Sequence, residues 1–379
     1  MRGPVPAQRG SGPLTAGPGP GLVERYLEQA VGGDGRVGVR LALDLIDNGV
    51  PARDVIVNLL GPAQREVGER WLANSWTVAE EHLVSGVTQK ALDAIAHTIG
   101  PPPATGLIAV ACAEGDWHSL PAQMLAEMLR AEGFAIAFLG GSAPADHVAT
   151  FITRRRPDAL AVSCNLGIFY GGVTRLADAA HRHGIPVLAG GRALGREPGR
   201  AARLGADAWA AGIDDAVAVL TGWQRRPPPI SAEPTPFEAA PAHLDSIARK
   251  IAGEALESLR VGYPPIASLN ERRLARTREQ LAVVTRFTAA ARLVDDPTVL
   301  TEMLGWLRTF LTSRGVPAAA LTAGLSALAP IIRRTDPLAA RLVLDAAADQ
   351  PPVPPTRGRR PDGAPGGDAR AVTRPGESG

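Results

Sequence analysis

Apolar residues follow two kinds of pattern along the chain, and the pattern changes twice. In the first part the apolar positions recur at helical spacing, as in 22–31 and 37–48, with Gly and Pro between the runs. Thr77, followed three residues later by Glu80, has the form of a capping box and predicts the start of a helix. Segment 22–99 is therefore expected to be a bundle of helices joined by short connections.

Short apolar runs then alternate with amphipathic helical stretches. Strands are expected at 105–112, 134–139, 159–163, 186–189 and 208–210. Because helices separate these strands, segment 104–224 is predicted to be an α/β domain with a doubly wound parallel sheet. In such sheets, ligands bind at the carboxyl ends of the strands.

Helical spacing returns in the last part of the chain, which predicts an all-α domain over 243–347. The apolar stripes consist of Leu300, Met303, Leu304, Leu307 and Leu311, and of Leu321, Leu325 and Leu328. We interpret these stripes as packed core in preference to a partner surface. The arginines between residues 272 and 278 are flanked by Glu271 and Glu279, which favours a solvated helix face over a DNA contact.

Three stretches are too rich in Gly and Pro to form a core. Residues 1–21 contain 11 Gly or Pro residues, residues 351–379 contain 13, and six prolines lie in 225–242. The ends, 1–21 and 350–379, are therefore expected to be disordered tails, and 225–242 a semi-rigid linker. A disordered 1–21 leaves no helix-turn-helix domain there.

Composition narrows the function classes further. The 40 basic and 38 acidic residues give a formal net charge of +2, which argues against a dedicated nucleic-acid binder. The two cysteines cannot form a disulfide framework or a structural zinc site alone. No apolar run reaches the roughly 18 residues of a membrane span, and no apolar signal follows Met1. We expect a cytoplasmic protein without direct DNA binding or membrane contact.

The loop after the first expected strand has the most informative side chains, Asp116 and His118. A His at the carboxyl end of a strand lies where ligands bind. An Asp two residues earlier can accept a hydrogen bond from one ring nitrogen, which fixes the tautomer and raises the basicity of the other. An isolated Asp-x-His pair is more often a loop His with a local hydrogen bond than a metal ligand.

The spacing of further residues resembles the cobalamin-binding domain shared by methionine synthase, corrinoid methyl carriers, base-off mutases and cobalamin-dependent photoreceptors. The family pattern is Asp-x-His-x-x-Gly, then Ser-x-Leu, then Gly-Gly. The matching residues here are Asp116, His118, Ser163, Gly190 and Gly191. Pro121 and Asn165 depart from the pattern, because they stand where the family has Gly and Leu. The alternative, a plain flavodoxin-like domain without cofactor, is disfavoured by the joint spacing.

The resemblance implies that cobalamin binds with its own tail base displaced from cobalt and His118 as the lower axial ligand. Ser163 would hydrogen-bond the buried tail base. Gly190 and Gly191 would let the backbone approach the nucleotide closely, because glycine has no Cβ. Pro121 removes backbone freedom where a helix begins, a position at which proline is tolerated. No catalytic residue is assigned in this chain.

Trp71 followed after nine residues by Glu81-His82 resembles the signature of the helical cap in light-sensing cobalamin regulators. That resemblance implies that Trp71 packs on the upper face of the corrinoid, where a 5′-deoxyadenosyl group sits, and that Glu81 lies near the same group. The alternative is a bundle-core Trp and a satisfied His82. Some of these photoreceptors have a His directly after the Trp as a second axial ligand; Leu72 stands there, so a bis-His photoproduct of that kind is not expected.

The resemblance favours a cobalamin-binding sensor for transcription regulation, which is a photoreceptor if the bound form is adenosylcobalamin. It would act through a protein partner or through self-association of the cap or the C-terminal helices. The alternative is a corrinoid methyl carrier that binds methylcobalamin and serves a separate methyltransferase. A third hypothesis is a helical protein that has lost its ligand.

Overall fold

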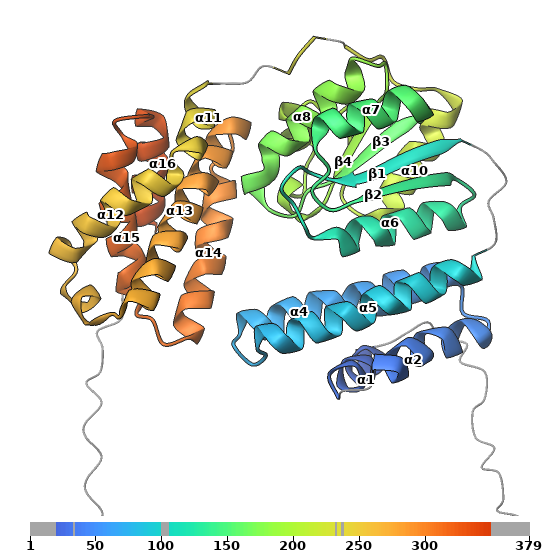
Figure 1. The fold of residues 1–379 in the computed structure, drawn as a ribbon, viewed down its shortest axis with the longest axis horizontal. Helices are drawn as coiled ribbons and strands as arrows, with labels where there is room; N and C mark the ends of the chain where they lie inside the picture. The colour runs from blue at the N-terminus through green and yellow to red at the C-terminus, as the bar shows by residue number, and fades with distance from the viewer. Residues whose placement is uncertain (1–19, 33–34, 100–105, 232, 236–238, 350–379) are drawn as a thin grey trace, which may run out of the picture.

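The computed structural model describes residues 20–32, 35–99, 106–231, 233–235 and 239–349. Helices alone form both ends of this part of the chain, and a five-stranded sheet lies between them (Figure 1). Residues 1–19 and 350–379, which include most of the expected tails, lie outside the described residues. Pro20 and Gly21, which were also expected to belong to a tail, are instead the first residues of a helix.

The N-terminal helices form the cap. They are α1 (Pro20–Val31), α2 (Gly35–Asp47), α3 (Ala52–Val55), a π-helical turn (Ile56–Leu60), α4 (Gly61–Leu72) and α5 (Val78–Thr98). The π turn joins α3 to α4, so residues 52–72 form one continuous helical stretch with a local widening at the π turn. At the start of α5 the predicted capping box is present: the Thr77 amide donates to the Glu80 carboxylate at 2.6 Å. Leucine, isoleucine and valine side chains from all these helices fill the cap core.

The middle of the chain forms the parallel sheet that the alternating pattern predicts. Its strands are β1 (Leu107–Cys112), β2 (Ala135–Gly140), β3 (Ala159–Ser163), β4 (Val187–Gly190) and β5 (Ala208–Ala210). Its helices are α6 (Ser119–Ala131), α7 (Ala145–Arg155), α8 (Tyr170–His181), α9 (Gly199–Arg203) and α10 (Ile213–Arg225). All strand pairs are parallel and the order is β2-β1-β3-β4-β5, which confirms the predicted doubly wound fold.

Alternation along the strands divides the α/β core into two layers. Ile108, Val110 and Cys112 pack on the side that α6 and α10 cover. Ala109 and Ala111 pack on the opposite side, with α7 and α8. Successive side chains of a strand point to opposite faces, so near-continuous apolar strands are what a sheet covered on both faces requires.

The C-terminal helices form the predicted all-α region, here named the bundle. They are α11 (Ala239–Ser246), α12 (Ala248–Gly262), α13 (Glu271–Val294), α14 (Thr298–Ser313), α15 (Ala318–Ile332) and α16 (Pro337–Ala348). α11 begins inside the segment expected to be a linker. The leucine stripes of α14 and α15 are buried, as expected for core. None of the helices in the described ranges has the length and apolarity that a membrane span requires.

The cap, the α/β domain and the bundle pack against one another. Met124 and Met128 of α6 belong to the apolar core of the cap. The bundle shares an apolar core with the α7–α8 side of the α/β domain. Figure 1 shows α14 on the side of the bundle that faces the other two parts. The carboxyl ends of the strands therefore lie in a region that all three parts approach.

Candidate functional site

The strand order places the candidate site between β1 and β3. In the order β2-β1-β3-β4-β5 the direction in which successive strands are added to the parallel sheet reverses at this pair, and ligands of such sheets bind outside the strand ends there. Cys112 pairs with Ser163, and Ser163 pairs with Gly190, so these three strands end at one level. The loop after β1 bears Asp116 and His118.

Asp116 is fully buried, and its carboxylate is surrounded by donors. Its Oδ1 accepts from the His118 amide at 3.0 Å and lies 2.7 Å from His118 Nδ1. Its Oδ2 accepts from the Asn165 amide at 2.7 Å. Burial raises the pKa of Asp116, but the hydrogen bonds from His118 and Asn165 outweigh it and leave the pKa below its usual value. The group is therefore a carboxylate at neutral pH.

His118 stands at the residue before α6, and its two ring nitrogens have different surroundings. Nδ1 contacts Asp116, whereas Nε2 has no hydrogen bond within the described part of the chain, and the side chain is 59% exposed. The hydrogen bond with Asp116 raises the pKa of His118, burial partly opposes it, and the charges of Asp116 and of Glu81 in the cap add to it. Nε2 is thus the ring atom that is free to bind a ligand.

Asn165 is a site residue that sequence reasoning missed. Besides its amide, its side-chain Nδ2 donates to Asp116 Oδ2 at 3.3 Å and to the His118 carbonyl at 3.3 Å. It therefore ties the loop after β3 to the loop after β1. The available signal was the polar residue at a position where the resembling family has Leu. Here Asn165 completes the hydrogen bonding of the buried carboxylate.

Three expected pocket residues lie at the neighbouring ends of β3 and β4: Ser163, Gly190 and Gly191. The two glycines also have a structural role within the chain. Ser163 is almost buried. Gly191 has φ of +105°, and a Cβ there would lie 2.4 Å from the Cys164 carbonyl oxygen. At Gly190 a Cβ would lie 3.3 Å from the Ala210 carbonyl oxygen. The close approach that Gly191 permits is therefore to the chain's own backbone after β3.

Trp117, between Asp116 and His118, is 76% exposed. Its neighbour across the sheet edge is the loop after β2, where a Cβ on Gly141 would lie 3.3 Å from the indole. Beside it lies an open hollow of about 230 Å³, lined by Leu139, Gly141 and the first turn of α7. A large apolar ring thus stands in solvent on the residue directly before His118.

The three cap residues singled out from the sequence are not gathered at one point. Glu81, in the first turn of α5, accepts from Ser85 at 3.0 Å and pairs with the exposed His82. Its charge is close enough to His118 to contribute to the raised pKa of that imidazole. Trp71, near the end of α4, instead contacts α14 of the bundle. The structure brings Glu81 toward His118 and engages Trp71 with a third part of the chain.

The side chains of this site suit a metal ion that is already bound by most of its ligands within a cofactor. In the described ranges there is no group of three or more His, Cys, Asp or Glu side chains able to hold a metal ion. Burial, with a smaller contribution from Asp116, raises the pKa of Cys112 to about 12, so its thiol stays protonated. His118 can supply one axial nitrogen, which is what a metal inside a macrocycle needs from the protein.

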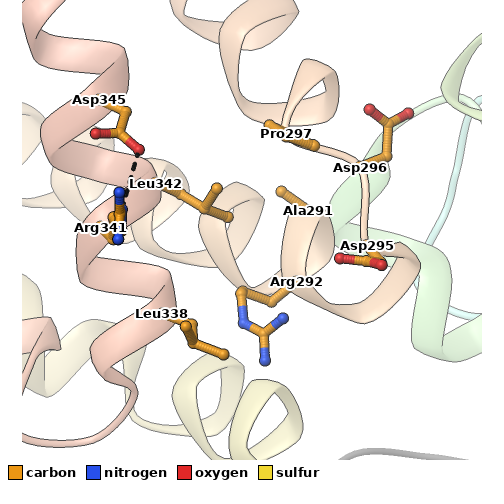
Figure 2. A pocket seen from close by; sticks show the side chains of 9 residues that line it. All are labelled: Ala291, Arg292, Asp295, Asp296, Pro297, Leu338, Arg341, Leu342 and Asp345. Carbon is orange, nitrogen blue, oxygen red and sulfur yellow. Dashed lines mark ion pairs between the residues drawn. The ribbon is translucent and has the colours of Figure 1, made fainter.

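A larger cavity lies elsewhere and has a different character. It measures about 260 Å³ and lies in the bundle, between the end of α13 and α16 (Figure 2). Its walls mix arginines with aspartates, and Arg341 lies 3.8 Å from Asp345. Since the two charge signs are interspersed, the cavity does not favour an ionic ligand of either sign.

Two segments match known domain families. Residues 22–96 match a B12 binding domain, and residues 106–219 match a second B12 binding domain. The HTH-type transcriptional repressor CarH of Myxococcus xanthus is 31% identical over 155 residues, which cover 40% of this chain and 51% of that protein. CarA of the same organism is 31% identical over 102 residues, 27% of this chain and 34% of that protein. The chain thus spans about half the length of CarH and about a third of the length of CarA.

Solved structures of corrinoid proteins are also similar. The monomethylamine corrinoid protein of Methanosarcina barkeri is 21% identical, with a TM-score of 0.47 over 52% of this chain and 96% of that chain. A cobalamin-binding protein of Desulfitobacterium hafniense is 19% identical, with a TM-score of 0.31 over 53% of this chain and 98% of that chain. At these scores the likeness adds no argument to the geometry above.

Proposed function

We propose that this chain, which contains both B12-binding domains in series, is a cobalamin-binding regulator whose cofactor lies between the cap and the α/β domain. The observation that supports this most is the state of His118. Its Nδ1 is held by a buried carboxylate, and its Nε2, at the β1/β3 switch point, has no hydrogen bond among the described residues. The charge of Glu81 in the cap adds to the raised pKa of the same imidazole. A corrinoid between these groups would be bound from both sides.

In this proposal His118 Nε2 is the lower axial ligand of cobalt. Asp116 holds the imidazole in the tautomer that leaves Nε2 unprotonated and raises its basicity, as carboxylates do for metal-bound histidines. Asn165 fixes the carboxylate from the opposite side. Ser163, at the end of β3, would donate a hydrogen bond to the displaced tail base. When bound as adenosylcobalamin, the cofactor supplies a cobalt–carbon bond that light can cleave.

The regulatory part of the proposal draws on the curated relatives, both of which are named transcriptional repressors. Because the matched part covers 51% and 34% of those proteins, DNA binding is not transferred with it. The basic stretch of α13 between residues 272 and 278 is exposed and flanked by glutamates, as on a solvated face. We therefore propose that the output is a protein contact made by the cap or the bundle.

The test is an absorption spectrum of the purified protein with adenosylcobalamin, recorded in the dark and after green light. We expect bound cobalamin with a His-ligated, base-off spectrum that converts on illumination. His118→Ala should lose the His-ligated spectrum, whereas His243→Ala, a control on the exposed face of α11, should retain it.

The outcomes separate the candidate functions. Absence of binding by the wild-type protein would refute the cobalamin assignment. Binding that persists unchanged in His118→Ala would remove His118 from the cobalt. Binding without any light-dependent change in spectrum or oligomeric state would instead support the methyl-carrier alternative. Stoichiometric methyl transfer from methylcobalamin to a partner methyltransferase would then be the next measurement.

A further inference from the structure

A single helix of the bundle contacts both cobalamin domains. α14 has 16 residues, so at 1.5 Å per residue it is about 24 Å long. The residues at its start contact the α/β domain through Arg200, and those at its end contact the cap at Trp71. α14 thus bridges the two parts between which the corrinoid is proposed to lie.

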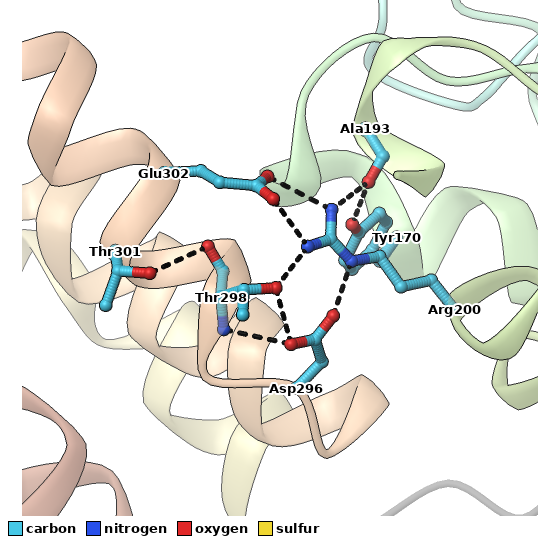
Figure 3. A network of polar contacts seen from close by, with 7 residues as sticks. All are labelled: Tyr170, Ala193, Arg200, Asp296, Thr298, Thr301 and Glu302. Atoms are coloured by element: carbon cyan, nitrogen blue, oxygen red, sulfur yellow. Dashed lines mark hydrogen bonds and ion pairs between the residues drawn. The ribbon is translucent and has the colours of Figure 1, made fainter. Parts of the chain in front are cut away.

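The first contact is a buried polar network. Arg200 of α9 is 7% exposed, and its Nε lies 2.7 Å from Asp296 Oδ2. Its Nη2 donates to Thr298 Oγ1 at 2.7 Å and lies 3.2 Å from Glu302 Oε1. Its Nη1 donates to the Ala193 carbonyl at 3.0 Å, as Figure 3 shows. Ala193 follows Gly191 closely, so the network ties the start of α14 to the loop after β4.

The second contact combines aromatic rings with helix capping. The rings of Trp71, Trp306 and Phe310 pack together, with centroids 5.2 to 5.8 Å apart. The Arg314 guanidinium lies 3.8 Å from the Phe310 ring centroid and donates to the Trp71 carbonyl at 2.9 Å. The Ser313 hydroxyl donates to the Leu72 carbonyl, also at 2.9 Å. These carbonyls belong to the last turn of α4, where helices lack internal donors and favour a cation.

Of the two contacts that α14 makes, the one with the cap is easier to break than the one with Arg200. Trp306 is 38% exposed, in contrast to the buried Arg200. Burial lowers the pKa of Arg314, and its partners within the described residues are carbonyl and hydroxyl oxygens and aromatic rings, with no carboxylate among them. Without the cap, Arg314 would lose the Trp71 ring and both α4 carbonyls. The surface on α14 is therefore shaped for this one occupant.

The cap is held at a second place, on α6. Met124 and Met128 belong to the cap core, and Gln123 donates to Asp93 of α5 at 2.7 Å. His118 lies directly before α6, and Glu81, whose charge reaches it, lies at the opposite end of α5 from this attachment. The proposed corrinoid position thus lies between an attachment on α6 and an attachment on α14.

We propose that the docking of α4 on α14, through Trp306, Phe310, Ser313 and Arg314, is coupled to corrinoid occupancy. The docking of α4 on α14 and the binding of the corrinoid both require the cap to stay over the strand ends, so each favours the other. Release of the corrinoid weakens the docking and uncovers the aromatic and cationic surface of α14, while Arg200 keeps the bundle on the α/β domain. This inference rests on the proposed cobalamin binding and adds the element that reads it out.

Coupling of this kind is reciprocal. If docking strengthens corrinoid binding by some factor, corrinoid binding strengthens docking by the same factor, and such factors are typically about 5- to 150-fold. The affinity of undocked variants and the docking of the ligand-bound wild type therefore measure one quantity in two ways. The affinity measurement requires variants, whereas the docking measurement uses the wild type.

The experiment compares Trp306→Ala and Arg314→Ala with Arg308→Ala, a control on the same helix whose side chain makes no hydrogen bond, ion pair or ring contact within the described residues. Affinity for adenosylcobalamin is measured in the dark by absorption titration. We expect roughly tenfold weaker binding in the first two variants and wild-type binding in the control. Hydrogen exchange in the wild type should slow at the end of α4 and the second half of α14 when adenosylcobalamin is added.

The results distinguish the inference from its premise. Wild-type affinity in Trp306→Ala and Arg314→Ala, or tighter binding, would overturn the coupling and leave cobalamin binding intact. Failure of the wild type to bind would overturn both. Exchange at the end of α4 should also accelerate in Arg314→Ala without any ligand; unchanged exchange there would show that the docking contact itself is absent in solution. Native-like exchange in the cap core verifies that the variants are folded.

Discussion

Asp116 determines what His118 can bind, because it occupies one ring nitrogen and favours the charged imidazolium. Hydrogen bonding to Asp116 is the main cause of the raised His118 pKa. In Asp116→Asn we expect the pKa of His118 in the ligand-free protein to fall below the wild-type value, since burial then has less opposition. NMR titration of the imidazole measures it. Asp158→Asn, whose carboxylate accepts from the Leu107 amide, is the control and should leave the His118 pKa unchanged.

The same pair predicts a pH dependence of stability. The folded-state pKa of His118 lies above its ordinary value of 6.5. Its contribution is therefore complete below that ordinary value and is lost as pH rises through the folded pKa. The free energy of unfolding of the wild type, relative to Asp116→Asn, should decline over this window in chemical denaturation. A difference that rises with pH there would contradict the assignment.

Trp117 provides a test of where the corrinoid lies. Its indole is 76% exposed beside His118, an unusual position for so large an apolar ring. Under oxidative footprinting we expect Trp117 to react readily in the free protein and to be protected several-fold when cobalamin is bound. Trp223, near the end of α10, packs in the α6–α10 layer of the sheet and should show no ligand-dependent change. Undiminished oxidation of Trp117 in the complex would place the corrinoid elsewhere.

At the level of elements, the loop after β4 depends on Gly191. Left-handed backbone alone costs a residue with a Cβ about 1–3 kcal/mol, and at Gly191 the added atom would also collide with the Cys164 backbone. Gly184 has φ of +70°, and a Cβ there would have no neighbouring atom within 4 Å, so this position isolates the backbone cost. Gly191→Ala should therefore destabilise the protein by more than Gly184→Ala, as measured by denaturant unfolding. Equal losses would mean that the loop relaxes without cost.

Local patterns were sufficient for the elements and for part of the site. Alternation of apolar runs with amphipathic stretches predicted all five strands, most clearly β1, β3 and β4, which are buried on both faces and are apolar almost throughout. The spacing of Asp116 and His118 predicted their pairing, since a two-residue separation in a loop allows it. Asn165 was not predicted as a partner of Asp116, because nothing local shows that the loop after β3 reaches a carboxylate in the loop after β1.

At the level of the whole molecule, the packing of the three parts was beyond sequence reasoning. Trp71 was expected to face the cofactor, and in the structure it packs against Trp306 and Phe310 of the bundle. Contacts between such distant positions leave no period or spacing in a single sequence. Arg200 illustrates the same point, because nothing near it in the chain indicates that Asp296 and Glu302 will surround it.

The Arg200 network makes a last prediction about how the bundle is held. Burial lowers the pKa of Arg200, but the hydrogen bonds with Asp296 and Glu302 outweigh it and raise the pKa above its usual value. Arg200→Ala removes this pairing and leaves the Ala193 carbonyl with the Tyr170 hydroxyl as its remaining donor. We expect a loss of about 2 kcal/mol, seen as lower denaturant stability and faster exchange at α9 and the start of α14. Arg203→Ala, whose ion pair with Asp295 is exposed, should change little.

At low pH the difference in stability between the wild type and Arg200→Ala should disappear, because the ion pair of Arg200 needs an ionised Asp296. Burial raises the pKa of Asp296, but hydrogen bonds from Thr298 and Arg200 prevail and hold it below its ordinary value of 3.8. The contribution of the pair is therefore present above that value and is lost as pH falls through the lower, folded-state pKa. Wild type and Arg200→Ala should converge in stability in this range. A gap that persisted below it would mean that Arg200 stabilises the interface through its packing and its neutral partners, Thr298 and the Ala193 carbonyl, and not through charge.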